Sequence, residues 1–227
     1  MFTYKYPKPS VAVDCVIFGF DGNALNVLLI KRKQAPFKGQ WAIPGGFVEE
    51  NESCEIAAYR ELQEETGLRN TNMELVGVFS DPKRDPRERV ISITYYTLIK
   101  KDDSIKGADD AEEAQWFPLK EIPPLAFDHA SLLTSARKCL ITKATFRPIG
   151  LNILSECFSL TDLHLLYEAV LGKRIAIRTL QRKLTSIKLL MTANTPDSTR
   201  RKRAKMLCFD ADKYNELTQK GIFIAFK

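Results

Sequence analysis

The stretch that decides the fold of the first part of this chain is GFVEENESCEIAAYRELQEETGL, Gly46–Leu68. Serine is favoured just before the first turn of a helix and glycine just after the last turn, so Ser53 and Gly67 predict a helix between them. Small residues, Ala57 and Ala58, are expected to leave room beside the acidic face of this helix. Three residues on the opposite side are expected to pack: Ile56, Tyr59 and Leu62.

Three carboxylates, from Glu61, Glu64 and Glu65, fall within about 100° of each other at 100° per residue. Because such close carboxylates repel one another, a bound Mg²⁺ or Mn²⁺ is the simplest way to stabilise them. Oxygen ligands favour these hard cations over zinc. Arg60 is placed to hold a carboxylate by a bidentate hydrogen bond. Gly45-Gly46 lets the preceding loop come close and offer a backbone carbonyl as a further ligand.

Nine specified residues stand at fixed spacing in this stretch: Gly46, Glu52, Arg60-Glu61-Leu62, Glu64-Glu65 and Gly67-Leu68. With them the chain resembles the Nudix hydrolase family. The resemblance implies a set of metal ligands: Glu61 and Glu65 as the main ligands, Glu64 as a further one, and a carbonyl of Gly45 or Gly46. It also implies that Glu52 and Arg60 support the geometry of the catalytic helix. An exposed acidic helix without a metal is the alternative, which the complete motif disfavours.

The reaction that the resemblance implies is the attack of water on the phosphorus of a nucleoside diphosphate derivative, with metal ions neutralising the developing charge. Such a reaction needs a general base, which family members take from the motif helix or from a carboxylate in a later loop. The sequence leaves six candidates open: Glu61, Glu88, Asp109, Asp110, Glu112 and Glu113.

Substrate choice is expected to depend on the segment DPKRDPRERV, residues 81–90. Three arginines there are candidates for phosphate contacts: Arg84, Arg87 and Arg89. Phe37, Trp41, Phe79 or a tyrosine is placed to stack on a base, although ordinary core packing is the more frequent role of any single aromatic residue. The segment and the following strand resemble those of ADP-ribose-directed members of the family, so ADP-ribose is the expected ligand.

The first part of the chain is predicted to be an α/β (α+β) domain with a mixed sheet. Strands are predicted at residues 11–20, 25–32, 73–79, 90–99 and 114–117, and a helix at residues 130–140. The sequence Asp21-Gly22-Asn23 between the first two strands is typical of a hairpin turn. We expect this Nudix-type domain to span residues 1–144.

The second part, residues 145–227, is predicted to be a small basic winged-helix domain. Residues 1–144 hold 19 Lys and Arg against 21 Asp and Glu, whereas residues 145–227 hold 15 against 7, a net charge of +8. Helices are predicted at residues 160–171, after Ser159 and before Gly172, and at residues 177–187. Two strands within residues 189–209, joined by the polar loop 194–205, complete the order of elements that a winged helix has.

The basic second part predicts a polyanion partner, double-stranded DNA in the first place. Arg178, Gln181 and Arg182 recur at helical spacing, and arginine and glutamine are residues that contact base edges in the major groove. The loop between the two strands is expected to lie on phosphates through Arg200, Arg201, Lys202, Arg203 and Lys205. A solvated basic face without a DNA partner is the alternative.

The whole chain resembles the Nudix-related transcriptional regulators of bacteria, in which a Nudix domain senses ADP-ribose or a sugar derivative and dimers release DNA. Two hypotheses follow from this resemblance. The chain is a metal-dependent ADP-ribose pyrophosphatase, or it is a DNA-binding regulator whose Nudix domain is a sensor. Many such regulators have a degraded motif, whereas this chain keeps every position, so loss of catalysis cannot be assumed. A homodimer is expected from the resemblance alone.

Composition excludes several other classes of protein. Apolar residues make up 44% and charged residues 27%, a profile of globular rather than disordered chains. The longest apolar run near the N-terminus, residues 16–20, is too short for a signal peptide or a spanning helix, which predicts a cytoplasmic protein without a membrane partner. The five cysteines are far apart in sequence, so zinc and disulfide frameworks are not expected.

Overall fold

The computed structural model describes residues 5–6, 8–69, 71–103, 105, 111–151, 153–192 and 206–220. The chain divides into two compact units, one formed by residues 1–19 and 26–137 and the other by residues 20–25 and 138–227. None of the described helices combines the length and the apolar character needed to cross a bilayer. The mixed α/β Nudix fold followed by a winged helix, predicted from the sequence, is confirmed.

The first unit is built on a sheet to which seven described strands belong. The strands are β1 (Ser10–Phe20), β2 (Leu25–Arg32), β3 (Trp41–Ala42), β4 (Gly45–Phe47), β5 (Glu74–Phe79), β6 (Val90–Lys100) and β7 (Ala111–Pro118). Their order is β3-β2-β1-β6-β5, with β4 paired to β1 and β7 paired to β2. Long apolar runs in β1 and β2 explain why these two strands are central, because both of their faces are buried.

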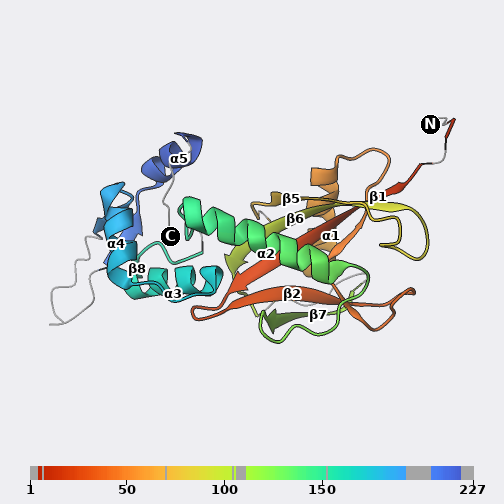
Figure 1. Cartoon of the computed structure of the whole chain (residues 1–227), viewed down its shortest axis with the longest axis horizontal. Coiled ribbons are helices and arrows are strands. Elements are labelled where there is room, and N and C mark those ends of the chain that lie inside the picture. Colours follow the sequence, from red (N-terminus) through yellow and green to blue (C-terminus); the bar gives the residue numbers. More distant parts are fainter. Residues whose placement is uncertain are drawn as a thin grey trace. The chain divides into compact units, whose positions relative to one another are not determined.

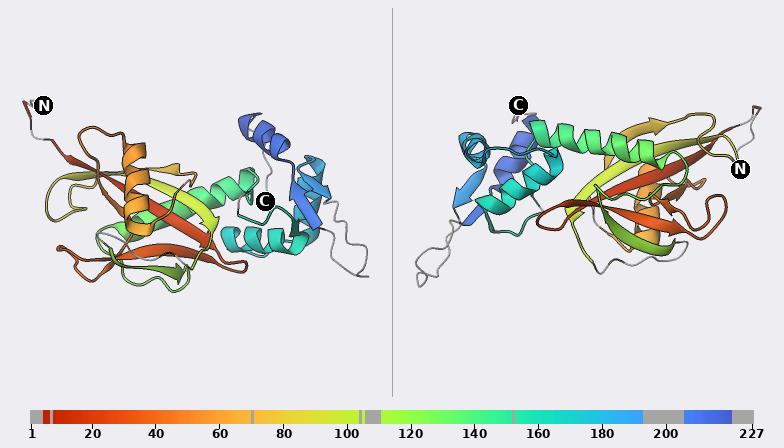
Figure 2. Two further views of the ribbon diagram at one scale, coloured as in Figure 1. Left: turned by 180° about the vertical axis from the view of Figure 1, so that it is seen from behind. Right: turned by 60° about the horizontal axis from the view of Figure 1, so that its bottom comes forward.

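Two helices cover opposite faces of this sheet (Figures 1 and 2). They are α1 (Cys54–Thr66) and the first half of α2 (His129–Phe146). Helix α2 begins one residue before the predicted helix and continues six residues beyond its predicted end at Leu140. Residues 141–146 contain neither Gly nor Pro, so nothing in the local sequence stops the helix there.

The prediction of which side of α1 packs was wrong for two residues. Ile56 and Tyr59 are 58% and 43% exposed, whereas Ala57, Ala58 and Leu62 are completely buried in one cluster with residues of the sheet. The alanines therefore do not leave room beside the acidic face. Because their side chains are small, the helix backbone lies close to the sheet, and this brings its glutamates next to β4.

The second unit contains the helices and hairpin of the predicted winged helix (Figure 2). Its elements are β8 (Phe158–Ser159), α3 (Leu160–Leu171), α4 (Ile177–Ser186), β9 (Leu190–Thr192), β10 (Met206–Phe209) and α5 (Ala211–Lys220). The strands form a sheet in the order β8-β10-β9, with antiparallel pairing throughout. Strand β8 and helix α5 were not predicted, since β8 has two residues and α5 has no apolar period of its own.

Helix α3 is capped as the sequence predicts. The Ser159 hydroxyl accepts a hydrogen bond from the backbone of Asp162, whose carboxylate accepts one in return from the backbone of Ser159. The buried side of the second unit consists of large apolar residues from several elements: Phe158, Leu163, Leu166, Tyr167, Leu180, Leu184 and Leu189. This unit therefore has a core of its own.

Candidate functional site

Helix α1 carries the acidic motif and has defined ends. The Ser53 hydroxyl accepts a hydrogen bond from the backbone N–H of Ile56 at 3.3 Å. At the other end Gly67 is in the left-handed conformation and its N–H donates to the carbonyl of Gln63 at 2.8 Å. Both caps predicted from the sequence are confirmed, so the register of the glutamates along the helix is fixed.

Arg60 is the centre of a network of carboxylates. Its Nε and Nη2 donate to the two oxygens of Glu52 at 3.1 and 2.6 Å, which is the bidentate geometry predicted for this arginine. Its Nη1 donates to Glu61 at 2.7 Å and to Glu64 at 3.0 Å, and its Nη2 also reaches the carbonyl of Phe47 at 3.1 Å. The hydrogen bonds from Arg60 lower the pKa of Glu52.

Gly45 and Gly46 lie against the motif helix because β4 pairs with β1, with Asp14 opposite Gly45. The N–H of Gly45 donates to the Glu65 carboxylate at 2.7 Å. A Cβ at Gly46 would overlap the carboxylate of Glu61, and a Cβ at Gly45 would overlap the carbonyl of Val13. Glycine is therefore required at both positions for the helix and the strand to approach this closely.

The chemistry of the donors fits a hard divalent cation. Glu61, Glu64 and Glu65 supply carboxylate oxygens, and the side chains of Glu61 and Glu65 are held between α1 and β4. Over the residues that the structure describes, no three acidic, histidine or cysteine side chains converge as a ready metal cluster. The Arg60 guanidinium bridges Glu61 and Glu64 instead, so a bound cation would compete with Nη1 of Arg60 for these two oxygens.

Burial affects the acidity of Glu61. Burial raises the pKa of Glu61, and the adjacent Arg60 opposes this only in part. Its side chain is 13% exposed, compared with 44% for Glu64. The charge of Glu61 is therefore less screened by water than that of Glu64 and has the greater need of a compensating cation.

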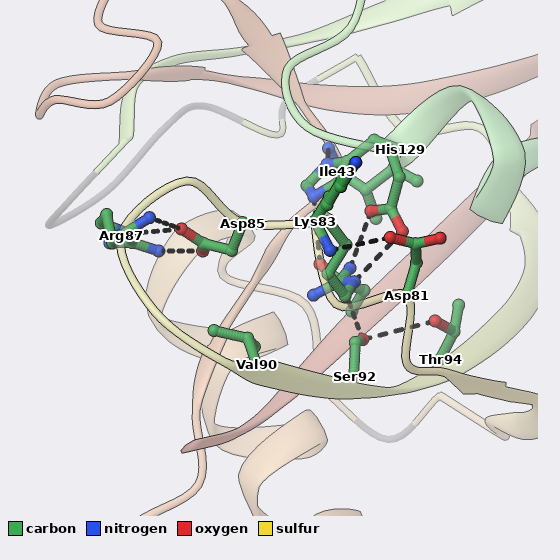
Figure 3. Close-up of polar contacts among 12 residues, drawn as sticks. Ile43, Asp81, Lys83, Asp85, Arg87, Val90, Ser92, Thr94 and His129 are labelled. Carbon is green, nitrogen blue, oxygen red and sulfur yellow. Dashed lines mark hydrogen bonds and ion pairs between the residues drawn. The ribbon is translucent and has the colours of Figure 1, made fainter. Parts of the chain in front are cut away.

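Next to Gly45 and Gly46 the first unit has a small cavity of about 60 Å³. Its lining includes charged and aromatic side chains from four separate segments: Asp14, Arg32, Arg84, Asp85, Arg87, Phe127 and His129. Figure 3 shows Asp85 and Arg87 on one side of this region, with His129 and Ile43 away from them. The cavity therefore borders the glutamate helix through β4 and collects cationic groups from the loops.

A buried ionic network forms one wall of the cavity. Arg84 donates to both oxygens of Asp128 at 3.1 and 2.8 Å, and its Nη2 reaches Asp14 at 3.4 Å. Asp14 also accepts a hydrogen bond from Ser92. Because the Arg84 side chain is only 5% exposed and already serves two carboxylates, it holds the loop 81–90 against β1 and α2.

His129 joins this network at the start of α2. Its Nδ1 accepts the backbone N–H of Ile43 at 2.9 Å, which leaves the proton of the neutral ring on Nε2, 3.5 Å from Asp14. Burial lowers the pKa of His129, and the nearby aspartates only partly offset this. The ring is therefore neutral and orients Asp14.

Two arginines and two aromatic rings form the opposite wall. The guanidinium of Arg32 lies over the ring of Phe127 at 4.8 Å, and that of Arg87 lies over Phe127 at 5.6 Å and over Phe47 at 5.4 Å. Burial, and then the nearby charge of Arg87, lowers the pKa of Arg32. Arg87 is also paired with Asp85 through two hydrogen bonds, at 3.0 and 2.7 Å. An anion placed between these guanidinium groups would relieve their mutual repulsion.

The other residues predicted to contact substrate lie in different environments in the structure. The ring of Phe37 packs edge-on against that of Phe127, with 4.7 Å between the ring centroids. Phe37 therefore lies beside the cavity wall that contains Arg32 and Phe127. Trp41 packs instead against Phe117 at 4.8 Å, as a core aromatic residue does. Arg89 is exposed, and its Nη1 donates a hydrogen bond to the carbonyl of Val90 at 3.5 Å.

The candidates for a general base are also separated. Glu61 lies in the motif site, whereas Glu88 is exposed on the loop 81–90 and Glu113 forms an ion pair with Lys31 at 3.8 Å. Asp109, Asp110 and the side chain of Glu112 lie outside the described residues.

Helix α4 presents the predicted basic face. Arg178, Gln181 and Arg182 are exposed, while Leu180 and Leu184 on the other side are completely buried. The turn before this helix is fixed by α3, because two α3 side chains, His164 and Glu168, bind the backbone of Ile175 at 2.6 and 2.8 Å. All five residues of the predicted loop contacts lie outside the described residues: Arg200, Arg201, Lys202, Arg203 and Lys205.

Several residues of the candidate site were missed by the sequence reasoning: Asp14, Arg32, Phe47, Phe127, Asp128 and His129. They come from β1, β2, β4 and the start of α2, and none belongs to the fixed-spacing motif. The one hint in the sequence was Asp14, a carboxylate inside an otherwise apolar strand, which requires a buried partner.

Comparison with known families and proteins matches both halves of the chain. The NUDIX domain family matches residues 8–136, and the NrtR DNA-binding winged helix domain matches residues 150–209. The chain is 33% identical over 183 residues to the ADPR responsive transcriptional repressor NtrR of Acinetobacter baylyi, a match that covers 79% of this chain and 73% of that protein.

Two further matches are to a pyrophosphatase and to a protein whose structure was solved in complex with DNA. The chain is 48% identical over 128 residues to the ADP-ribose pyrophosphatase of Methanocaldococcus jannaschii, which covers 56% of this chain and 73% of that protein. The crystal structure of Shewanella oneidensis NrtR complexed with a 27mer DNA superposes with a TM-score of 0.74 at 31% identity, over 90% of this chain and 95% of that chain. The similarity to the repressor structure thus extends through both units.

Proposed function

We propose, on the premise that this chain belongs to the NUDIX domain family, that it is a DNA-binding regulator whose Nudix domain binds ADP-ribose. The observation that carries this proposal is the exposed face of Arg178, Gln181 and Arg182 on a helix that sits in a winged helix of the NrtR type. A pyrophosphatase of the Nudix type has no need of such a face. We place the domains at residues 1–144 and 145–227, with the two family matches on either side of that division.

ADP-ribose fits the cavity wall formed by Arg32, Arg87 and Phe127. A pyrophosphate carries two negative charges, and two neighbouring guanidinium groups of which one is partly buried provide the matching cations. Phe47, which is 40% exposed, offers an aromatic surface for the adenine ring. The relatives named for ADP-ribose, a repressor and a pyrophosphatase, support the same ligand.

DNA binding is proposed for the second domain. Helix α4 is proposed to enter the major groove, where Arg178, Gln181 and Arg182 contact base edges. The basic residues of the loop between β9 and β10, Arg200, Arg201, Lys202, Arg203 and Lys205, are proposed to contact phosphates. Two copies of the chain are expected to bind two half-sites, as helix-turn-helix dimers do.

Hydrolysis of ADP-ribose is a second proposed activity, favoured by the complete set of motif residues. Glu61, Glu64 and Glu65 would hold Mg²⁺ or Mn²⁺, and Arg60 and Glu52 would keep the helix in register with β4. A metal held by these residues would supply Lewis acidity to the reaction. Gly45 and Gly46 allow strand β4 to lie directly against Glu61 and Glu65.

Calorimetric titration of the full chain with ADP-ribose tests the ligand. Arg87→Ala is expected to weaken binding roughly 10-fold, because it removes one of two cations from the pyrophosphate site, whereas Lys83→Ala, an exposed cation of the same loop, is expected to change it little. Absence of binding by the wild-type protein, or equal loss in both variants, would overturn the proposal.

Release of AMP from ADP-ribose in the presence of Mg²⁺ tests hydrolysis separately. Glu65→Gln is expected to abolish the release, since it removes the charge that faces β4, whereas Glu55→Gln, an exposed residue of the same helix, is expected to leave it unchanged. A wild-type protein that binds ADP-ribose and releases no AMP would be a sensor without catalysis, and would remove hydrolysis from the proposal.

A further inference from the structure

The winged-helix unit contains two free cysteines side by side. The Sγ atoms of Cys157 and Cys208 are 3.7 Å apart, although the residues are 51 positions apart in the chain. Cys157 directly precedes β8, and Cys208 lies within β10. The other cysteines of the chain have no such neighbour among the described residues.

The sheet register explains this proximity. In the antiparallel pair of β8 and β10, Phe158 lies opposite Leu207, so the next opposed pair along the strands is Cys157 with Cys208. Directly opposed residues of antiparallel strands have Cα atoms about 4.5–5.5 Å apart, which falls within the range of about 4.4–6.8 Å that disulfides span. The backbone is therefore already placed for a bond between these two sulfurs.

The two thiols also share one face of the sheet. Side chains alternate along a strand, so Phe158 and Phe209, whose rings are 4.8 Å apart, point to the face opposite from the cysteines. Cys157 and Cys208 are each half-buried, so a small reagent in solution can reach them without unfolding of the core.

We propose that Cys157 and Cys208 form a redox-sensitive dithiol that a two-electron oxidant such as a peroxide converts to a disulfide between β8 and β10. Each thiol loses its proton and the two sulfurs together give up two electrons, which reduce hydrogen peroxide to two molecules of water as the S–S bond forms. A dithiol reductant reverses the reaction. The Sγ atoms need to close only from 3.7 Å to about 2.05 Å.

The cross-link has a defined mechanical consequence. Strand β8 leads directly into the capped start of α3 at Ser159, and β10 follows the loop of the wing hairpin. A bond between Cys157 and Cys208 ties this hairpin covalently to the beginning of α3. Closing a loop of this length restricts the unfolded chain, so the oxidised unit is expected to be more stable than the reduced one.

Peptide mapping of the full chain after peroxide treatment and alkylation tests the proposal. The expected result is a peptide pair that joins Cys157 to Cys208, lighter than the two thiol peptides by two hydrogen atoms and separated again by dithiothreitol. Cys54 and Cys139, which are also half-buried, serve as internal controls and are expected to remain alkylated. The Tm of the oxidised protein is expected to rise by about 5 °C or more.

Two variants complete the test. Cys139→Ser is expected to keep the cross-link and the rise in Tm, whereas Cys157→Ser is expected to lose both. The wild-type map decides the question even if Cys157→Ser does not fold. Full alkylation of Cys157 and Cys208 after oxidation, pairing with a second copy of the chain, or sulfinic acid in place of the disulfide would each overturn the proposal.

Discussion

Both carboxylate oxygens of Glu52 accept hydrogen bonds from Arg60, one from Nε at 3.1 Å and the other from Nη2 at 2.6 Å. The planar guanidinium thus uses one edge for Glu52 and keeps Nη1 for Glu61 and Glu64. A cation that binds Glu61 and Glu64 competes with Nη1 alone, and the contact with Glu52 can persist. Arg60 thus stabilises the three glutamates through hydrogen bonds, and with a metal bound it would still hold the helix in place through Glu52.

Arg60→Lys tests this division of roles. Lysine keeps the charge but cannot bind both oxygens of Glu52 while contacting the other glutamates, so we expect Mn²⁺ affinity to fall about 10- to 100-fold. Calorimetric titration with Mn²⁺ measures the change, and Arg69→Lys, an exposed arginine just after the helix, is the control. Unchanged affinity in Arg60→Lys would show that the fork geometry is dispensable.

Gly46→Ala tests the close approach of β4 to the helix. The added methyl group would overlap the Glu61 carboxylate, so either the side chain or the strand must move. We expect a loss of about 1–3 kcal/mol in the free energy of unfolding, and weaker Mn²⁺ binding at temperatures where the variant remains folded. Chemical denaturation measures the first effect. A variant as stable as the wild type, with full metal affinity, would contradict the observed packing.

The buried histidine gives the first domain a pH dependence. Burial lowers the pKa of His129 below its ordinary value of 6.5. As the pH falls below 6.5, the unfolded chain therefore binds a proton at this residue before the folded protein does. The contribution of neutral His129 to the free energy of unfolding is therefore fully present above pH 6.5, and it is lost as the pH falls through the lowered pKa. Among its neighbours, Asp14 and Asp128 raise the pKa of His129 in part, and Arg84 and Arg32 lower it further.

Thermal denaturation between pH 5 and 7 measures this dependence. His129→Asn keeps an acceptor for the N–H of Ile43 and removes the titrating ring, so we expect its Tm to fall less than that of the wild type as the pH decreases. His164→Asn is the control, since the chain has only two histidines. Parallel curves for the wild type and His129→Asn would rule out His129 as the origin.

Arg182→Ala tests the proposed DNA interface. If Arg182 contacts a base edge, its removal is expected to cost about 1–3 kcal/mol of binding free energy on a duplex selected from a random library. Lys120→Ala, which removes one charge from the first unit, is the control for a general loss of positive charge. Equal effects of the two variants would indicate that only net charge matters.

The sequence was sufficient for those parts of the structure that depend on local interactions. Capping residues predicted the helix between Ser53 and Gly67 and the helix between Ser159 and Gly172. A bidentate hydrogen bond from Arg60 to a carboxylate was also predicted, and the structure identifies that carboxylate as Glu52. The positions of β1, β2, β5, β6 and β7 along the chain were also predicted, because apolar runs and turns mark them. The short strands β3 and β4 and the order of the strands within the sheet were not predicted.

Contacts between distant segments could not be predicted in the same way. Arg84 and Asp128 are 44 positions apart, and Asp14 and Ser92 are 78 positions apart, so only the folded sheet brings them together. The packing side of α1 was mistaken for the same reason, since the sheet accepts the small residue Ala57 and leaves Ile56 exposed. Apolar character alone does not specify which side of a helix meets a closely approaching sheet.

The most direct test of the proposed regulator is to titrate ADP-ribose into a complex of the full chain with its selected duplex, followed by fluorescence anisotropy at fixed salt. Since the Nudix domain is proposed to bind the ligand and the winged helix to bind DNA, we predict that ADP-ribose releases the duplex and that Arg87→Ala shifts the release to higher ligand concentration. A complex that stays intact while ADP-ribose saturates the protein would contradict the proposed function.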